Sequence, residues 1–162
     1  MLGAIMDMTA PAAFHSGIVT SRFVATCEFY FELFGFAPLE ITEDYALLGR
    51  SDGARLALLQ AGADGQPAAL SQPTRGQGMW LTFESDDVEA LHTRLVARGI
   101  EIVCDPEDTL SGQRRCIARD PNGVLVYVTS RRVADDSSVS PNRSETKHHE
   151  DHRSRLHRLS CH

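Results

Sequence analysis

The order of predicted secondary-structure elements repeats along the chain, and this repeat constrains the fold more than any other feature. Each copy begins with an apolar strand, continues with an amphipathic helix that ends at a glycine, and closes with three further strands. The helix-ending glycines are Gly35 and Gly99, and a turn containing Gly53 or Gly123 precedes the last strand of each copy. Two copies of one β-α-β-β-β unit mean that the fold must be interpreted at the level of the repeat.

The first copy occupies residues 13–60. Its first strand is predicted at Phe14–Val19, and the period of two along a strand places His15, Gly17 and Val19 on one face. The helix that follows carries one apolar face, and Gly35 is the expected C-terminal cap. The predicted elements are a helix at Arg22–Phe34 with its apolar face made by Phe23, Cys27, Tyr30, Phe31 and Phe34, and strands at Phe36–Thr42, Tyr45–Gly49 and Arg55–Gln60.

The second copy occupies residues 79–130. Its first strand is predicted at Met79–Glu84, and Trp80, Thr82 and Glu84 share one face by period two. The next two residues, Asp86 and Asp87, suit a helix N-terminus through capping and the helix dipole. The remaining predictions are a helical face of Val88, Leu91, Leu95 and Val96, strands at Ile100–Cys104, Gln113–Ala118 and Val124–Val128, and a loop at Asp105–Gly112.

Three segments show neither the helical nor the strand period of apolar residues. Residues 1–12 are predicted to form a loose N-terminal arm, and the Gly-, Pro- and Gln-rich residues 61–78 a linker loop. Residues 131–162 are rich in Ser, Asp, Arg and His and too poor in apolar residues to offset chain entropy, so a disordered tail is expected there. The tail pair His148 and His152 has helical spacing but is not part of a metalloprotease pattern.

The charge of the chain argues against a nucleic-acid partner. Residues 1–130 hold 9 Lys+Arg and 17 Asp+Glu, so their net charge is 9 − 17 = −8, whereas residues 131–162 carry 7 − 5 = +2. Nucleic-acid binding requires a basic face. An acidic domain suits a cationic small molecule, although acidity also serves solubility alone.

The cysteines and the hydropathy pattern predict a cytoplasmic, soluble protein. Four cysteines occur without a Cys-x-x-Cys pair, which favours reduced thiols over a disulfide framework or a zinc site. No apolar run approaches the ~20 residues that a membrane-spanning helix needs. We therefore expect no membrane partner.

Five short motifs follow one another along the two modules. They are the His15 strand, Phe29-Tyr30 with Phe34-Gly35-Phe36, Ser85-Asp86-Asp87-Val88, Ala97-Arg98-Gly99-Ile100 and Asp120-Pro121-Asn122-Gly123. With these motifs in this order, the paired modules resemble the vicinal oxygen chelate superfamily, which includes glyoxalase I, bleomycin-resistance proteins and extradiol dioxygenases. The resemblance covers roughly residues 13–130 and implies an α+β fold of two tandem modules whose cupped sheets surround a pocket.

The resemblance also implies where a metal would be bound. Metal-using relatives take one ligand from the first strand of each module and one from the last strand, four residues after the turn glycine. In this chain these positions are His15, Trp80, Ala57 and Tyr127. Only His15 is a usual ligand, because alanine has no donor atom and the indole N–H is a hydrogen-bond donor that cannot ligate. A catalytic divalent ion needs about three protein ligands, so no metal cofactor is predicted.

The loss of ligands predicts a binding pocket in place of a metal site. Trp80 and Tyr127 offer aromatic faces that stack planar, including cationic, molecules, and Ala57 leaves space. The leading hypothesis is a metal-independent small-molecule binding protein similar to the bleomycin-resistance branch, which sequesters an antibiotic. By resemblance it is expected to be a homodimer. The predicted ligand-binding residues are His15, Ala57, Trp80, Thr82, Glu84 and Tyr127.

Two alternatives remain open at the level of sequence. The aromatic residues could fill a collapsed barrel, leaving an interaction module without a pocket. The chain could also be a lyase, epimerase or dioxygenase with a divergent metal site, or a cofactor-free enzyme that uses His15 as its acid or base. Alternation along the strand predicts that either Arg114 or Arg115 faces the pocket, without deciding which. His92, at a polar helical position, is expected to be exposed.

Overall fold

The computed structural model of the chain describes residues 13–131 and contains both predicted modules. The predicted arm and, apart from Arg131, the predicted tail lie outside the described residues. The first module consists of β1 (Ser16–Thr20), α1 (Phe23–Phe34), β2 (Ala37–Ile41), β3 (Tyr45–Gly49) and β4 (Arg55–Gln60). The second consists of β5 (Trp80–Ser85), α2 (Val88–Ala97), β6 (Ile102–Asp108), β7 (Arg114–Arg119) and β8 (Leu125–Ser130). The predicted α+β fold of two tandem β-α-β-β-β modules is confirmed.

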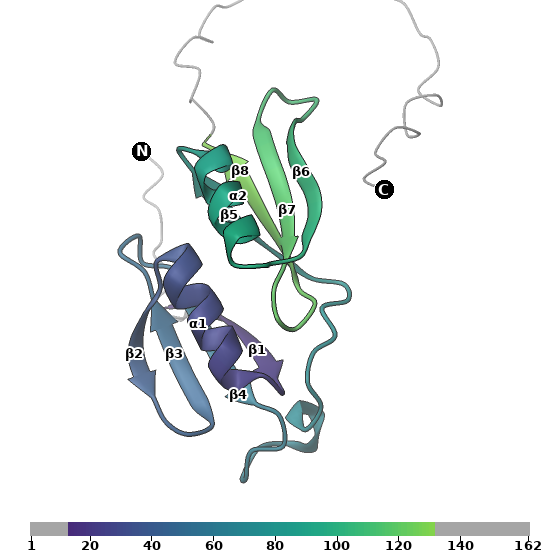
Figure 1. Cartoon of the computed structure of the whole chain (residues 1–162). Coiled ribbons are helices and arrows are strands. Elements are labelled where there is room, and N and C mark those ends of the chain that lie inside the picture. The colour runs from purple at the N-terminus through teal and green to yellow at the C-terminus, as the bar shows by residue number, and fades with distance from the viewer. Residues whose placement is uncertain (1–12, 132–162) are drawn as a thin grey trace, which may run out of the picture. The chain divides into compact units, whose positions relative to one another are not determined.

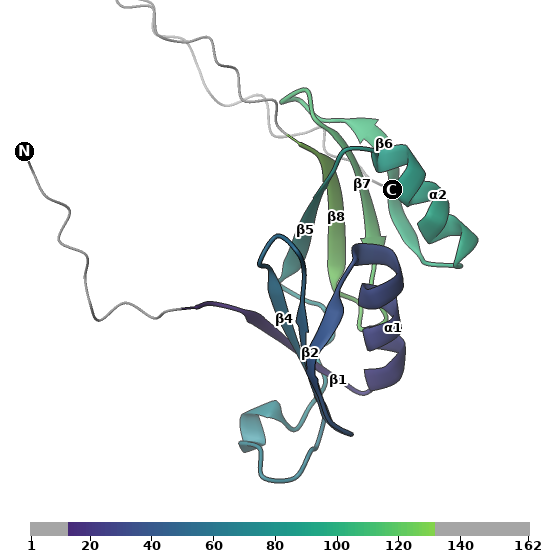
Figure 2. The ribbon, with the colours of Figure 1, turned by 90° about the vertical axis from the view of Figure 1, so that its left-hand side faces the viewer.

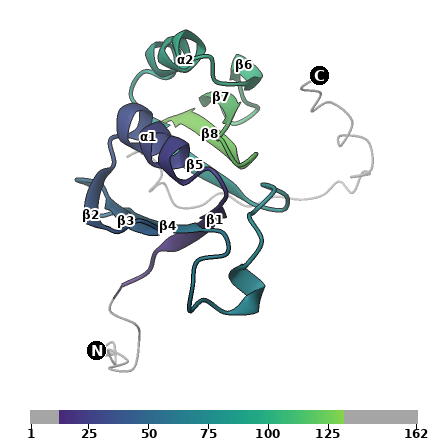
Figure 3. The ribbon, with the colours of Figure 1, turned by 60° about the horizontal axis from the view of Figure 1, so that its bottom comes forward.

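Each module folds into its own four-stranded sheet covered by its own helix. The strand order is β1-β4-β3-β2 in the first sheet and β5-β8-β7-β6 in the second. In the first sheet β1 pairs in parallel with β4, whereas β2, β3 and β4 are successive antiparallel neighbours. Figure 1 shows α1 lying across the first sheet, and Figure 3 shows α2 above the second. The face of each sheet that its own helix does not cover is called its open face below.

The core of the first module lies between α1 and the first sheet. Strand residues that alternate toward the helix, such as Ile18 and Leu58, are almost completely buried. The helix face differs from the predicted one, because Phe29 and Leu33 are buried while Phe23 and Phe31 are only half-buried. The predicted members Cys27, Tyr30 and Phe34 are buried. The prediction followed the largest side chains, and the packed face is rotated from them toward Thr26 and Leu33.

The ends of α1 and of two strands illustrate how well local signals define boundaries. Gly35 caps α1 with a φ of 68°, in the left-handed region that glycine adopts without cost, and its N–H donates to Tyr30 O. The strands β3 and β4 have the predicted bounds. In contrast, β1 begins at Ser16 and not at Phe14, so His15 precedes the strand.

The strand β6 is longer than predicted and occupies half of the expected loop. It continues to Asp108, and Glu107 pairs with Arg115 on β7. Pro106 lacks a backbone N–H, which makes this stretch look like a loop in the sequence. The structure accommodates it at a shift in register between Cys104 and Glu107.

The second helix begins as predicted but presents a narrower apolar face. The Asp87 side chain accepts a hydrogen bond from Ala90 N at 2.8 Å, which confirms the predicted cap. Val88 and Leu95 are buried, but Val96 is 52% exposed and is not part of the core. Val88 and Leu95 lie on the face of α2 that is buried in the core, and the adjacent Val96 points toward solvent.

Contacts divide the described residues into two compact units that do not coincide with the two modules. One unit holds residues 13–81 together with residues 119–125, and the other holds residues 82–118 and 126–131. The turn before β8 therefore packs with the first module. No helix among residues 13–131 is long and apolar enough to span a bilayer.

Candidate functional site

The open face of the first sheet contains a hollow between two small residues. Gly17 on β1 pairs with Ala57 on β4, and a Cβ placed on Gly17 would lie 3.9 Å from the Ala57 Cβ. Neither residue fills the space above the sheet. The result is a cavity of about 280 Å³. It is lined by Gly17, Ile18, Val19, Tyr45, Ala57, Leu59, Gln66 and Leu70.

The predicted linker forms one wall of this cavity. It contains a short helical turn, Ala68–Leu70, in a segment predicted as loop. Figure 2 shows this turn on the side of the first sheet opposite α1. Gln66 and Leu70 reach the cavity from it. The sequence signal for this role is weak, since Leu70 is simply a leucine within a polar segment without period.

Of the predicted binding residues, Ala57 is the one that lines this cavity. His15 is exposed and lies just before β1, so the strand ladder does not fix its orientation. Trp80 is 63% exposed on β5. The cavity lining includes neither of them. The structure therefore does not bring His15 into the same hollow as Ala57.

The other predicted binding residues lie on the second sheet. Exposed Trp80, Thr82 and Glu84 alternate along β5 with residues that are half-buried, so these three side chains share one face. Tyr127 is half-buried on β8 between the fully buried Val126 and Val128. Because Val126 and Val128 belong to the core, Tyr127 points to the opposite, open face.

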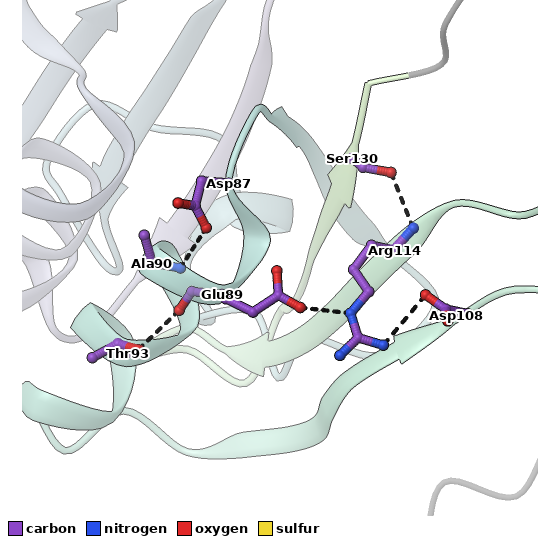
Figure 4. A network of polar contacts seen from close by, with 7 residues as sticks. All are labelled: Asp87, Glu89, Ala90, Thr93, Asp108, Arg114 and Ser130. Atoms are coloured by element: carbon purple, nitrogen blue, oxygen red, sulfur yellow. Dashed lines mark hydrogen bonds and ion pairs between the residues drawn. The ribbon is translucent and has the colours of Figure 1, made fainter.

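The structure also assigns the two arginines of β7 to opposite faces. Arg114 Nε donates to Glu89 on α2 at 2.6 Å, and its Nη1 donates to Asp108 at 3.3 Å, so Arg114 lies on the helix side (Figure 4). Strand alternation then places Arg115 on the open face, where it donates to Glu107 at 2.7 and 3.1 Å. Arg115 is the arginine on the face predicted to bind ligand.

His92 is not exposed as predicted. Its side chain is 20% exposed, and its Nε2 lies 3.1 Å from Asp105 on β6. The error arises because Asp105 was assigned to a loop, whereas it belongs to a strand beside α2. This contact joins helix to sheet, and nothing in it indicates catalysis. The predicted tail histidines lie outside the described residues.

A polar network that joins the turn before β8 to α1 and β1 was not predicted from the sequence. Asp120 is 4% exposed, and its Oδ2 accepts hydrogen bonds from the Tyr30 hydroxyl at 3.0 Å and from Asn122 Nδ2 at 3.1 Å. Asn122 Nδ2 also donates to Thr26 at 3.1 Å, and Asn122 Oδ1 accepts from Thr20. The turn Asp120–Gly123 is thus fixed to the start of α1 and the end of β1.

The network has an electrostatic consequence for Tyr30. Burial raises the pKa of the Tyr30 hydroxyl well above its usual value, and the negative charge of Asp120 raises that pKa further. The hydroxyl therefore stays protonated and serves as a permanent donor to Asp120. Tyr30 was assigned to the apolar core from its spacing, and its polar partner is 90 residues away in the sequence.

Comparison with known proteins identifies the family. The model of the Glyoxalase/Bleomycin resistance protein/Dioxygenase superfamily matches residues 12–128. The chain belongs to this superfamily. No curated protein matches it in sequence.

Solved structures of several proteins share the fold. A virulence protein from Salmonella typhimurium is 24% identical with a TM-score of 0.57, covering 76% of this chain and 98% of its own. TioX from Micromonospora sp. ML1 is 20% identical with a TM-score of 0.57, covering 76% and 98%. Lactoylglutathione lyase from Agrobacterium tumefaciens is 24% identical with a TM-score of 0.56, covering 75% and 95%. Likenesses at this level of identity show the fold alone.

The donor atoms of this chain do not fit the metal site that its metal-using superfamily relatives are expected to share. Of the four corresponding positions, only His15 carries a conventional ligand, and Ala57 carries none. Residues 13–131 contain no group of three or more His, Cys, Asp or Glu side chains placed to hold an ion. The space that a ligand side chain would take at residue 57 is part of the cavity.

Proposed function

We propose that this chain binds a small, largely apolar organic molecule and does so without a metal ion. The observation that carries the proposal is the cavity of about 280 Å³ at Gly17 and Ala57. Its volume is near the lower end of the ~300–1,000 Å³ typical of small-molecule pockets. Such a volume favours a compact molecule of up to three rings over a large antibiotic.

The chemistry of the cavity wall supports an apolar ligand. Most lining side chains are aliphatic, and burying apolar ligand surface against them contributes roughly 25 cal/mol per Å² before the cost of association is subtracted. Tyr45 adds an aromatic ring to the wall. None of the lining residues is charged, so the cavity favours an uncharged molecule over the cationic one considered from the overall charge.

Filling the cavity is expected to weaken binding strongly. In Ala57→Phe the new ring occupies the hollow beside Gly17, so a neutral probe such as N-phenylnaphthylamine should bind at least about tenfold more weakly, a loss of about 1.4 kcal/mol. The measurement is a titration of the dye, whose emission rises in apolar surroundings. Binding that persists unchanged in Ala57→Phe would place the ligand elsewhere.

The matched control is Ala54→Phe. Ala54 is exposed one residue before β4 and is not part of the cavity wall, so the same ring added there should leave the affinity unchanged. Repeating both titrations in EDTA tests the second half of the proposal. Loss of wild-type binding in the chelator would contradict metal independence.

Trp80 does not line the cavity, but it is exposed and is the single tryptophan of the chain, so it tests separately whether the aromatic surface predicted from the sequence binds a planar molecule. We expect a neutral naphthoquinone to quench its fluorescence saturably through stacking. Trp80→Ala should weaken binding of the quinone by about threefold to tenfold, as measured by calorimetry, while Trp80→Phe retains most of the affinity. Equal affinity in wild type and Trp80→Ala would exclude Trp80 from the binding surface.

A further inference from the structure

The linker that walls the cavity is held at both ends and is called the strap below (residues 61–74). Ala61 N donates to Thr20 O at 2.8 Å, and Thr74 N donates to Val19 O at 2.8 Å. Both acceptors are on β1, next to the cavity. The strap therefore leaves the sheet and returns to it beside neighbouring residues of β1.

Within the strap, local chemistry defines the conformation around Gln66. Gly65 has a φ of 76°, a conformation that few other residues adopt. Pro67 follows at a φ of −56°, and a proline restricts the preceding residue to extended conformations. Pro67 thus restricts the backbone of Gln66, an exposed residue that contributes to the cavity wall. An amide placed in this way loses little backbone entropy when it forms a hydrogen bond.

Two of the lining side chains carry polar groups, the Tyr45 hydroxyl and the Gln66 amide. The amide both donates and accepts hydrogen bonds, and it is neutral at every accessible pH. A ligand hydroxyl or carbonyl that enters an apolar cavity without a partner is penalised. A ligand that meets Gln66 avoids that penalty, whereas an ion would remain unpaired among uncharged residues.

We propose that Gln66 is the specificity-determining residue of the cavity and that it selects neutral, compact aromatic molecules bearing one hydroxyl or carbonyl group. The proposal rests on the proposed binding function, and it adds the class of ligand and the residue that selects that class. The strap supplies this residue from outside both sheets. Leu70, on the same strap, contributes an apolar wall.

The experiment compares naphthol with naphthalene, which lacks the hydroxyl, by displacement of N-phenylnaphthylamine. In the wild type we expect naphthol to be favoured, and in Gln66→Leu the ratio of the two affinities should fall by about threefold to tenfold. Gln72→Leu is the matched control, because Gln72 is, like Gln66, an exposed glutamine of the strap but lies outside the cavity wall. Its ratio should equal that of the wild type.

The outcomes separate this inference from the proposed function. If Gln66→Leu keeps the wild-type ratio while Ala57→Phe weakens dye binding as expected, the cavity is the site but Gln66 does not select the ligand. If Tyr45→Phe removes the preference and Gln66→Leu does not, the hydroxyl of Tyr45 is the selecting group and the proposal is wrong. If Ala57→Phe leaves dye binding intact, the failure lies with the proposed function itself.

Discussion

Replacing Gly76 with alanine is expected to lower the free energy of unfolding by about 3 kcal/mol, through overpacking and a left-handed backbone. Gly76 is buried at a φ of 68°, and its missing side chain leaves room for the turn Asp120–Gly123. A Cβ at residue 76 would overlap the C and O atoms of Gly123 and the N atom of Val124. These are backbone atoms of a turn fixed by buried hydrogen bonds, so they cannot move aside cheaply.

The control for this prediction is Gly78→Ala. Gly78 has nearly the same backbone conformation, with a φ of 75°, but a Cβ there would meet nothing within 4 Å. It should cost only the backbone term, about 1–2 kcal/mol. The free energies come from urea titration of both variants. Equal losses for the two variants would show that the close approach of Gly76 to Gly123 carries no energy.

The close approach at Gly76 also bears on the cavity. Thr74 N donates to Val19 on β1, and Gly76 N donates to the Thr74 side chain at 3.2 Å. The end of the strap is therefore fixed both to the sheet and to the turn before β8. A residue too large at position 76 would displace the strap as well as the turn.

The repeat and most element boundaries were predictable because their causes are local. The strands β3 and β4 are separated by an Asp-Gly turn. The alternating residues Ala46 and Leu48 of β3, and Leu56 and Leu58 of β4, form the buried face. Helix ends were marked by Gly35 and Asp87, whose roles follow from backbone geometry and capping. These signals need no knowledge of the rest of the chain.

The features that could not be predicted depend on contacts between distant segments. The extension of β6 to Asp108 depends on pairing with β7, and the orientation of Arg114 depends on Glu89 of α2. Alternation shows that two adjacent residues face opposite ways, but only the position of the helix decides which faces the core. The cavity beside Ala57 is lined in part by Gln66, which comes from a segment without any hydrophobic period, so its lining could not be predicted.

The turn Asp120–Gly123 combines a local feature that the sequence predicted with a long-range contact that it did not predict. Its sequence indicated a turn before a strand, and counting from its glycine indicated the position of Tyr127. The structure places Asp120 under α1, where it serves residues of the first module. Asp120, which begins the turn, is therefore a buried hydrogen-bond acceptor, and we expect it to contribute to the free energy of unfolding.

Replacing Asp120 with alanine is expected to destabilise the protein by about 4 kcal/mol, because several buried donors lose their acceptor at ~1–3 kcal/mol each. Oδ1 accepts from the backbone N–H groups of Asn122 and Val124, both at 2.8 Å, and Oδ2 accepts from Tyr30. The Tyr30 side chain is completely buried and has no access to water. Denaturant unfolding followed by circular dichroism measures the loss.

The corresponding turn of the first module supplies the control. Asp52 Oδ1 accepts from Ala54 N at 3.0 Å, but its side chain is 54% exposed, so water replaces the lost partner. Asp52→Ala should therefore cost less than about 1 kcal/mol. If Asp52→Ala proves as harmful as Asp120→Ala, burial of the acceptor is not the cause.

Tyr30→Phe and the double variant complete the test by isolating the contact between Tyr30 and Asp120 in a mutant cycle. The raised pKa of Tyr30 also predicts how the stability changes at alkaline pH. Unfolded tyrosine ionises near pH ~10, and burial holds the folded pKa higher, so above that pH the unfolded state binds fewer protons. The contribution of Tyr30 to stability is therefore present below pH ~10 and declines as pH rises through the folded pKa. Tyr30→Phe should lack this part of the alkaline decline, whereas a decline equal to that of the wild type would assign it to other groups, such as Cys116, whose pKa burial raises to about 11.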